Sequence, residues 1–202
     1  MVELESLVRE NIRKLKPYTS ARDEFSGTAS IFLDANENAF GTPLEKSAFH
    51  RYPDPYQQKL KEKISDWLAI PADHIFLGNG SDEAIDLILR VFGQPGQDEV
   101  LIMPPTYGMY QVSAQINDLQ VVEVPLTPSF KLDRQAIEKV ISDKLKIAFV
   151  CSPNNPTGNV FASEEIVWLL EHFKGIVIVD EAYIDFAPQK SVLPLIKQYN
   201  HL

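Results

Sequence analysis

The sequence contains a single cysteine, Cys151, so no disulfide can form within the chain. No apolar run approaches the roughly 20 residues that a membrane-spanning helix needs, and residues 1–16 lack the apolar block of a secretory signal. Basic residues are also few, since 19 lysines and arginines stand against 28 aspartates and glutamates, for a net charge of −9. Nucleic acid is therefore a poor partner, because its phosphates are bound by clustered lysine and arginine. We expect a cytoplasmic protein that binds neither nucleic acid nor membrane.

Motifs for nucleotides and metals are likewise missing. Residues 176–181 resemble the magnesium-binding strand of P-loop NTPases, but no Gly-Lys-Ser or Gly-Lys-Thr occurs in the chain. The glycine turn at 78–83 is not a dinucleotide fingerprint, because Glu83 stands where the last small residue belongs. The four histidines show no metal-ligand spacing. A nucleotide-binding α/β domain thus stays an alternative that neither fingerprint supports in full.

Short apolar segments alternate with amphipathic ones along most of the chain. Apolar residues at helical spacing predict helices over residues 57–68, 81–92, 107–116, 132–141 and 164–173. Runs that are apolar at nearly every position predict strands over residues 31–33, 75–77, 100–103, 121–124, 147–150 and 176–179. Such strands belong to a sheet that is covered on both faces, and alternation with helices makes the sheet largely parallel. The sequence therefore predicts a three-layer α/β fold.

The N-terminal segment is a separate feature. Residues 4–15 carry apolar side chains at helical spacing, and Pro17 ends the pattern. So short an amphipathic helix needs a surface to lie against. That surface is either the core of its own chain or a partner subunit, and the residues alone leave both open.

In open parallel sheets, ligands bind at the carboxyl ends of the strands. The turn at 78–83 is either a tight turn capped by Ser81 or Asp82, or an anion site at a helix start. Asp180 follows four apolar residues, where an unpaired carboxylate is unfavourable. Tyr107 could present its ring to a flat ligand or pack in the core, and Asn155 could donate to a ligand or form an Asn-Pro turn. Cys151 is expected to pack as a small apolar residue.

Taken together and in this order, the motifs resemble the fold type I pyridoxal-phosphate (PLP) enzymes, the aspartate aminotransferase superfamily. The pairing of Asn-Pro-Thr-Gly at 155–158 with Asp-Glu-Ala-Tyr at 180–183 is specific there. More narrowly, the chain from about Asn11 onward is similar to the histidinol-phosphate aminotransferase family. The stretches that carry this similarity are residues 17–22, 33–38, 51–53, 80–83 and 105–110.

The resemblance implies a fold and a set of roles. The fold would be the truncated large domain of the PLP-dependent transferases, with an N-terminal arm and the start of a small domain over residues 1–55 and a PLP-binding domain over 56–202. Asp180 would pair with the protonated pyridine nitrogen of the cofactor. Asn155 and Tyr183 would hydrogen-bond its phenolic oxygen, and Tyr107 would stack on its ring. The cofactor phosphate would be held by Gly80, Ser81 and Asp82.

Further implied roles concern the substrate and a second subunit. Tyr18 would touch the phosphate of the substrate, and Asn36 lies in the segment that would line the substrate pocket. Tyr52 would reach across the interface of a homodimer to the cofactor phosphate of the partner, and the N-terminal arm would dock on that partner.

The sequence departs from the family at one point. Members carry the Schiff-base lysine in a Ser-Lys motif beyond the Asp-Glu-Ala-Tyr segment, and neither Lys190 nor Lys197 has that context. We therefore expect no catalytic residue of that kind among these 202 residues, which by themselves would be inactive. The parent enzyme would transaminate L-histidinol phosphate with 2-oxoglutarate in histidine biosynthesis. The alternatives are a phospho-amino-acid decarboxylase, an aromatic aminotransferase or a non-catalytic truncated fragment.

Overall fold

The computed structural model describes residues 2–20, 31, 33–43, 49–189 and 191–202. The chain forms two compact units, one made of residues 1–15 and 78–202 and the other of residues 16–77. The domain boundary expected after residue 55 stays a prediction.

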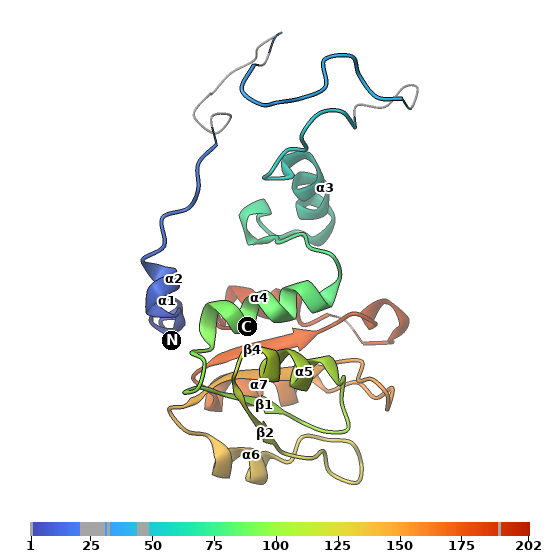
Figure 1. The fold of residues 1–202 in the computed structure, drawn as a ribbon. Coiled ribbons are helices and arrows are strands. Elements are labelled where there is room, and N and C mark those ends of the chain that lie inside the picture. The colour runs from blue at the N-terminus through green and yellow to red at the C-terminus, as the bar shows by residue number, and fades with distance from the viewer. Residues whose placement is uncertain (1, 21–30, 32, 44–48, 190) are drawn as a thin grey trace. The chain divides into compact units, whose positions relative to one another are not determined.

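The first unit is built on a four-stranded parallel sheet (Figure 1). Its strands are β1 (Glu99–Ile102), β2 (Gln120–Glu123), β3 (Leu145–Cys151) and β4 (Ile176–Asp180), in the spatial order β2-β1-β3-β4. Every neighbouring pair is parallel, and Cys151 at the end of β3 is in register with Asp180 at the end of β4. The predicted parallel sheet is confirmed, with each strand within a few residues of the expected bounds.

Side chains alternate between the two faces of this sheet, as the pleat requires. On one face Val100, Ile147 and Phe149 pack against α4 (Ser81–Phe92) and α5 (Met109–Ile116). On the other face Leu101 and Val150 pack in the same cluster as α6 (Arg134–Val140) and α7 (Ser163–His172). Two helical layers therefore enclose the sheet, which confirms the predicted three-layer α/β fold. Each fully buried leucine or isoleucine contributes about 1.5–3 kcal/mol by leaving water.

Helices α4 and α6 begin and end where their sequences provide the signals. Ile85 and Leu89 face the sheet from α4, and Gly93, just past its end, donates its N–H to the carbonyl of Leu89. Asp133 caps α6, because its Oδ1 accepts the N–H of Ala136 at 3.0 Å. These local signals fix the helices that cover the sheet.

The N-terminal segment forms two short helices, α1 (Leu4–Leu7) and α2 (Glu10–Arg13), in place of the single predicted helix. Val8 has an extended backbone, which breaks the helical repeat. Arg9 then holds the segment against the end of α4, since its backbone N–H donates to Val91 O at 3.0 Å and its guanidinium to Arg90 O at 2.8 Å. The segment thus lies on its own unit, and docking on a partner subunit stays a prediction.

The second unit contains α3 (Gln58–Leu68) and a 3-10 turn, η1 (Ala72–His74). Helix α3 confirms the helix predicted over 57–68, but the strand predicted over 75–77 is wrong. A strand exists only by pairing with a neighbour, and no described residue pairs with this segment. Ile31 and Leu33 are not in a strand either, and Phe32 lies outside the described residues.

Two further 3-10 helices, η2 (Ile184–Phe186) and η3 (Leu193–Lys197), follow β4 in the first unit. Beyond them, the backbone N–H of Val177 in β4 donates to the carbonyl of His201 at 2.9 Å. Across the described ranges, none of the helices combines the length and apolar character that a membrane crossing requires.

Candidate functional site

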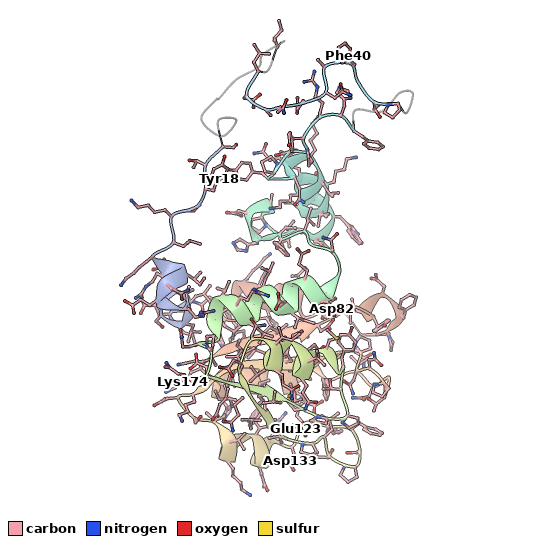
Figure 2. The ribbon with its side chains drawn as sticks, in the orientation of Figure 1. Tyr18, Phe40, Asp82, Glu123, Asp133 and Lys174 are labelled. Atoms are coloured by element: carbon pink, nitrogen blue, oxygen red, sulfur yellow. The ribbon has the colours of Figure 1, made fainter. Side chains whose placement is uncertain are left out.

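The carboxyl ends of β1, β3 and β4 lie at one edge of the parallel sheet, and the segments that follow them carry the predicted polar residues. Figure 2 shows Asp82 at the start of α4, on the side of the first unit toward which the arrow of β4 points, with Lys174 on the opposite side. The start of α4 and the ends of the strands therefore form one region. We name this region the carboxyl edge.

Asp180 is the last residue of β4, and it is partly buried. Its Oδ2 accepts the hydroxyl proton of Tyr110 at 2.7 Å, and its Oδ1 accepts the N–H of Ala182 at 3.0 Å. Each oxygen therefore has one donor and keeps capacity for a further one. The carboxylate is held in place by these two contacts and is able to accept a third donor from a ligand.

Tyr107 connects the segment after β1 with the start of α4. Its hydroxyl donates to Asp82 Oδ1 at 3.1 Å, and its ring meets that of Tyr110 edge-on, with 5.5 Å between centroids and 85° between planes. Loss of hydration raises the pKa of Tyr107, and the negative charges of Asp82 and Asp180 raise it further. Tyr107 therefore interacts with both the start of α4 and the end of β4.

The turn before α4 has the geometry of an anion cradle. Gly80 adopts φ +78°, which L side chains rarely adopt, and a Cβ there would meet nothing within 4 Å. Within the described chain, no acceptor is bonded to the N–H groups of Ser81 and Asp82, which begin the helix. Glu83 folds back to accept both the backbone and the side-chain N–H of Asn79. The free N–H groups and the helix dipole favour an anion.

The segment after β3 is held in place by Asn154, the residue before the predicted ligand donor Asn155. Asn154 is buried, donates to Pro105 O at 2.8 Å and to Thr157, and accepts the hydroxyl proton of Thr106 at 3.1 Å. Asn155 and Tyr183 line the same cavity of about 340 Å³. The structure thus brings these two predicted residues together.

The other three predicted residues, Tyr18, Asn36 and Tyr52, belong to the second unit and are exposed. Glu37, which follows Asn36, accepts the N–H of Tyr52 at 2.8 Å and forms an ion pair with Arg51 at 2.6 Å. The Glu37 side chain is only 5% exposed in this pair. Two motifs that are separate in sequence are therefore joined within the second unit.

Cys151 is buried beside Asp180, as a small apolar residue would be, and burial raises the pKa of its thiol. In the described ranges, no cluster of three or more histidine, cysteine or acidic side chains could hold a metal ion. A larger cavity, of about 820 Å³, lies between α1 and residues 172–175, which precede β4. That cavity is at the opposite ends of the strands, and no predicted site residue lines it.

Sequence reasoning missed Tyr110 and Asn154, which orient the residues that it named. Tyr110 lies one helical turn after Tyr107, a spacing that would have indicated a shared surface. Asn154 carried no such signal, because its partners Pro105 and Thr106 become neighbours only when the loops fold.

Comparison with known proteins gives consistent results. A family model described as aminotransferase class I and II matches residues 29–202. A histidinol-phosphate aminotransferase from Cytophaga hutchinsonii is 53% identical over 199 residues, which are 98% of this chain and 57% of the relative. One from Bacteroides fragilis is 48% identical over 203 residues, covering 100% of this chain and 57% of the relative.

Among solved structures, that of the histidinol-phosphate aminotransferase from Clostridium acetobutylicum superposes with a TM-score of 0.63 at 30% identity, over 74% of this chain and 44% of that one. The chain thus spans a little over half the length of the curated relatives that it matches.

Proposed function

Because the chain belongs to the class I and II aminotransferases, we propose that the protein carrying it transfers the amino group of L-histidinol phosphate to 2-oxoglutarate. The named relatives, similar along nearly the whole chain, support this choice of substrate. The observation that carries the proposal is the placement of Tyr107. It bonds Asp82 at the helix start and interacts with Asp180 at the end of β4, so that an anion cradle, an aromatic ring and a carboxylate adjoin one another.

The cofactor of the proposed reaction is pyridoxal 5'-phosphate, and the described residues fit it. The free N–H groups of Ser81 and Asp82 behind Gly80 suit a phosphate. Asp180 has one donor on each oxygen and can accept another from a protonated ring nitrogen. The carboxylates of Asp82 and Glu83 accept hydrogen bonds from Tyr107 and Asn79, and so they do not occupy the N–H groups of the cradle.

When bound, the cofactor supplies an electron sink for the negative charge that develops at the substrate carbon. Asp180 would sustain that sink, because a carboxylate at the ring nitrogen keeps this atom protonated. Tyr107 would orient the ring by stacking on its face. Asn155 and Tyr183 would donate to its phenolic oxygen, and their shared cavity supports this pairing.

We further propose that Tyr18 and Asn36 contact the substrate and that Tyr52 serves the neighbouring subunit of a homodimer. All three side chains are exposed within the second unit, as residues that await a ligand or a partner would be. The hydrogen bond from the backbone N–H of Tyr52 to Glu37 would fix the position of this tyrosine for that role. The buried free thiol of Cys151 suits the reducing cytoplasm, in which we expect the protein to work.

We also propose that residues 1–202 by themselves do not catalyse transamination. Enzymes of this family use a lysine that binds the cofactor covalently and transfers the proton during the reaction. Lys190 and Lys197 lack the Ser-Lys context of that lysine. Borohydride reduction after addition of the cofactor tests this point, because labelling of one lysine in stoichiometric yield would contradict it.

The decisive assay uses the complete protein that carries this sequence. We expect it to form glutamate from 2-oxoglutarate with L-histidinol phosphate as amino donor, and much more slowly with phenylalanine. Faster transfer from phenylalanine would indicate an aromatic aminotransferase. Release of carbon dioxide from a phosphorylated amino acid, without amino transfer, would indicate a decarboxylase and overturn the proposal.

A further inference from the structure

Tyr110 is the most completely buried tyrosine among the described residues, with none of its surface exposed. Its ring is stacked on Phe149 of β3, with 4.6 Å between centroids and 7° between planes, and it meets the ring of Tyr107 edge-on. A ring held on two sides has little freedom to rotate. The position of its hydroxyl is therefore set by the packing of α5 on the sheet.

That hydroxyl is directed at a single carboxylate. It donates to Asp180 Oδ2 at 2.7 Å, across 70 residues of sequence. The backbone N–H of Ala182 holds the other oxygen, so the carboxylate has a fixed orientation. A hydrogen bond to a charged group of this length is among the stronger ones in proteins.

The hydroxyl of Tyr110 also keeps its proton at any pH at which the protein works. Burial raises the pKa of Tyr110 far above its ordinary value, and the neighbouring Cys151 and Asp180 raise it further. Tyr110 therefore acts as a neutral donor to Asp180. It donates a hydrogen bond to the carboxylate and leaves the negative charge in place. A lysine or an arginine at this position would instead neutralise that charge.

We infer that Tyr110 is a positioning residue, whose hydroxyl holds the Asp180 carboxylate ready for the ring nitrogen of the cofactor. The inference rests on the proposed function and adds to it a residue that does not touch the cofactor. We therefore expect that loss of the hydroxyl weakens the interaction of Asp180 with the ring nitrogen and leaves the remaining cofactor contacts unchanged.

The test compares two ligands in the complete protein: pyridoxal 5'-phosphate and its analogue with carbon in place of the ring nitrogen. The ratio of their dissociation constants reports the contact at the ring nitrogen alone. We expect Tyr110→Phe to reduce the preference for the natural cofactor by roughly tenfold. Binding of the analogue should change by less than about twofold, since Phe keeps the stacked ring. Asp180→Asn should abolish the preference.

Tyr199→Phe is the matched control, because it removes a tyrosine hydroxyl that bonds the exposed Glu171 away from the carboxyl edge. It should leave the preference unchanged. An unchanged preference in Tyr110→Phe, with a lost preference in Asp180→Asn, would overturn the inference while the proposed function stands. If the wild-type protein binds neither ligand, or binds both equally, the proposed function fails and the inference with it.

Should Tyr110→Phe not fold, 3-fluorotyrosine at position 110 provides a second test. Fluorine keeps the shape of the ring and makes the hydroxyl a stronger donor. We expect the preference for the natural cofactor to rise, and an unchanged or reduced preference would overturn the inference.

Discussion

The side-chain amide of Asn154 donates a hydrogen bond to the backbone carbonyl of Pro105 at 2.8 Å, across 49 residues of sequence. Pro105 belongs to the segment after β1, and Asn154 to the segment after β3. The contact ties together the loop that presents Tyr107 and the loop that presents Asn155. Thr106 adds a second bond between the same loops, through Asn154 Oδ1.

Asn154→Ala is therefore expected to reduce the free energy of unfolding by about 2 kcal/mol. The substitution removes two part-buried hydrogen bonds, to the Pro105 carbonyl and from the Thr106 hydroxyl, and each such bond contributes about 1 kcal/mol. Urea unfolding measures the change. Asn200→Ala, which removes an exposed amide bonded to Val2 O, should stay within about 0.5 kcal/mol of wild type. Equal stability of both variants would show that Asn154 does not hold the loops.

Gly80→Ala is expected to lower stability by about 1–3 kcal/mol, because the φ of +78° is unfavourable for any residue with a Cβ. The added methyl group would meet nothing within 4 Å, so the cost is conformational rather than steric. Gly108→Ala is the matched control, since Gly108 is equally open but has φ −66°. We expect Gly108→Ala to be neutral or slightly stabilising. Thermal unfolding of the two variants and of the wild-type protein measures both effects. The interpretation fails if the two variants behave alike.

The stability of the protein should fall as the pH falls below about 6.5, in part because of His201. Burial lowers the pKa of His201, although its hydrogen bond to the Leu170 carbonyl works in the opposite direction. A lowered pKa means that the unfolded chain takes up the proton first. Stability from this group is complete above the unfolded pKa and is lost as pH falls toward the folded one.

Unfolding measured at pH 7.5 and pH 5.5 tests the role of His201. The limiting slope for one group is about 1.4 kcal/mol per pH unit. His201→Gln, which can still donate to Leu170, should have a shallower dependence on pH than wild type. Identical dependence would assign the effect to other groups.

Glu37→Ala is expected to release the backbone of Tyr52 in the second unit. Hydrogen bonds to charged groups contribute about 1.5–3 kcal/mol, and every 1.4 kcal/mol is a factor of ten. Hydrogen exchange at the Tyr52 amide should therefore accelerate roughly tenfold or more. Glu10→Gln removes an exposed ion pair with Lys14 and serves as the control, with no effect at Tyr52. Unaltered exchange in Glu37→Ala would contradict the anchoring role.

The sheet was predictable because β1, β3 and β4 are apolar on nearly every residue, and this pattern occurs where both faces are covered. Burial of Val100, Leu101 and Ile147 on the two faces shows the same cause at work. The segment 75–77 has the same composition, but Phe76 is 59% exposed and the segment pairs with no described strand. Composition indicates that a segment can form a strand, whereas pairing depends on neighbours that three residues cannot specify.

The places of the predicted site residues in the fold were predictable to a similar depth, while their roles stay proposals. Asp180, Tyr107 and the turn at Gly80 stand at strand ends or helix starts, which sequence patterns locate well. The contacts that orient them were not predictable, because Tyr110 reads as an ordinary core residue of α5. Its role depends on Asp180 becoming a neighbour, which follows from the strand order together with the packing of α5 on the sheet.

The most direct test of the central claim is the rate of glutamate formation from L-histidinol phosphate and 2-oxoglutarate by the complete protein and by its Asp180→Asn variant. The variant keeps the shape of the side chain but removes the charge that would sustain a protonated ring nitrogen. We predict amino transfer by the wild-type protein and a rate lower by roughly a hundredfold or more in the variant, as expected when a group that stabilises developing charge is lost. Equal rates, or no transfer by the wild-type protein, would contradict the assignment of the carboxyl edge as the catalytic site.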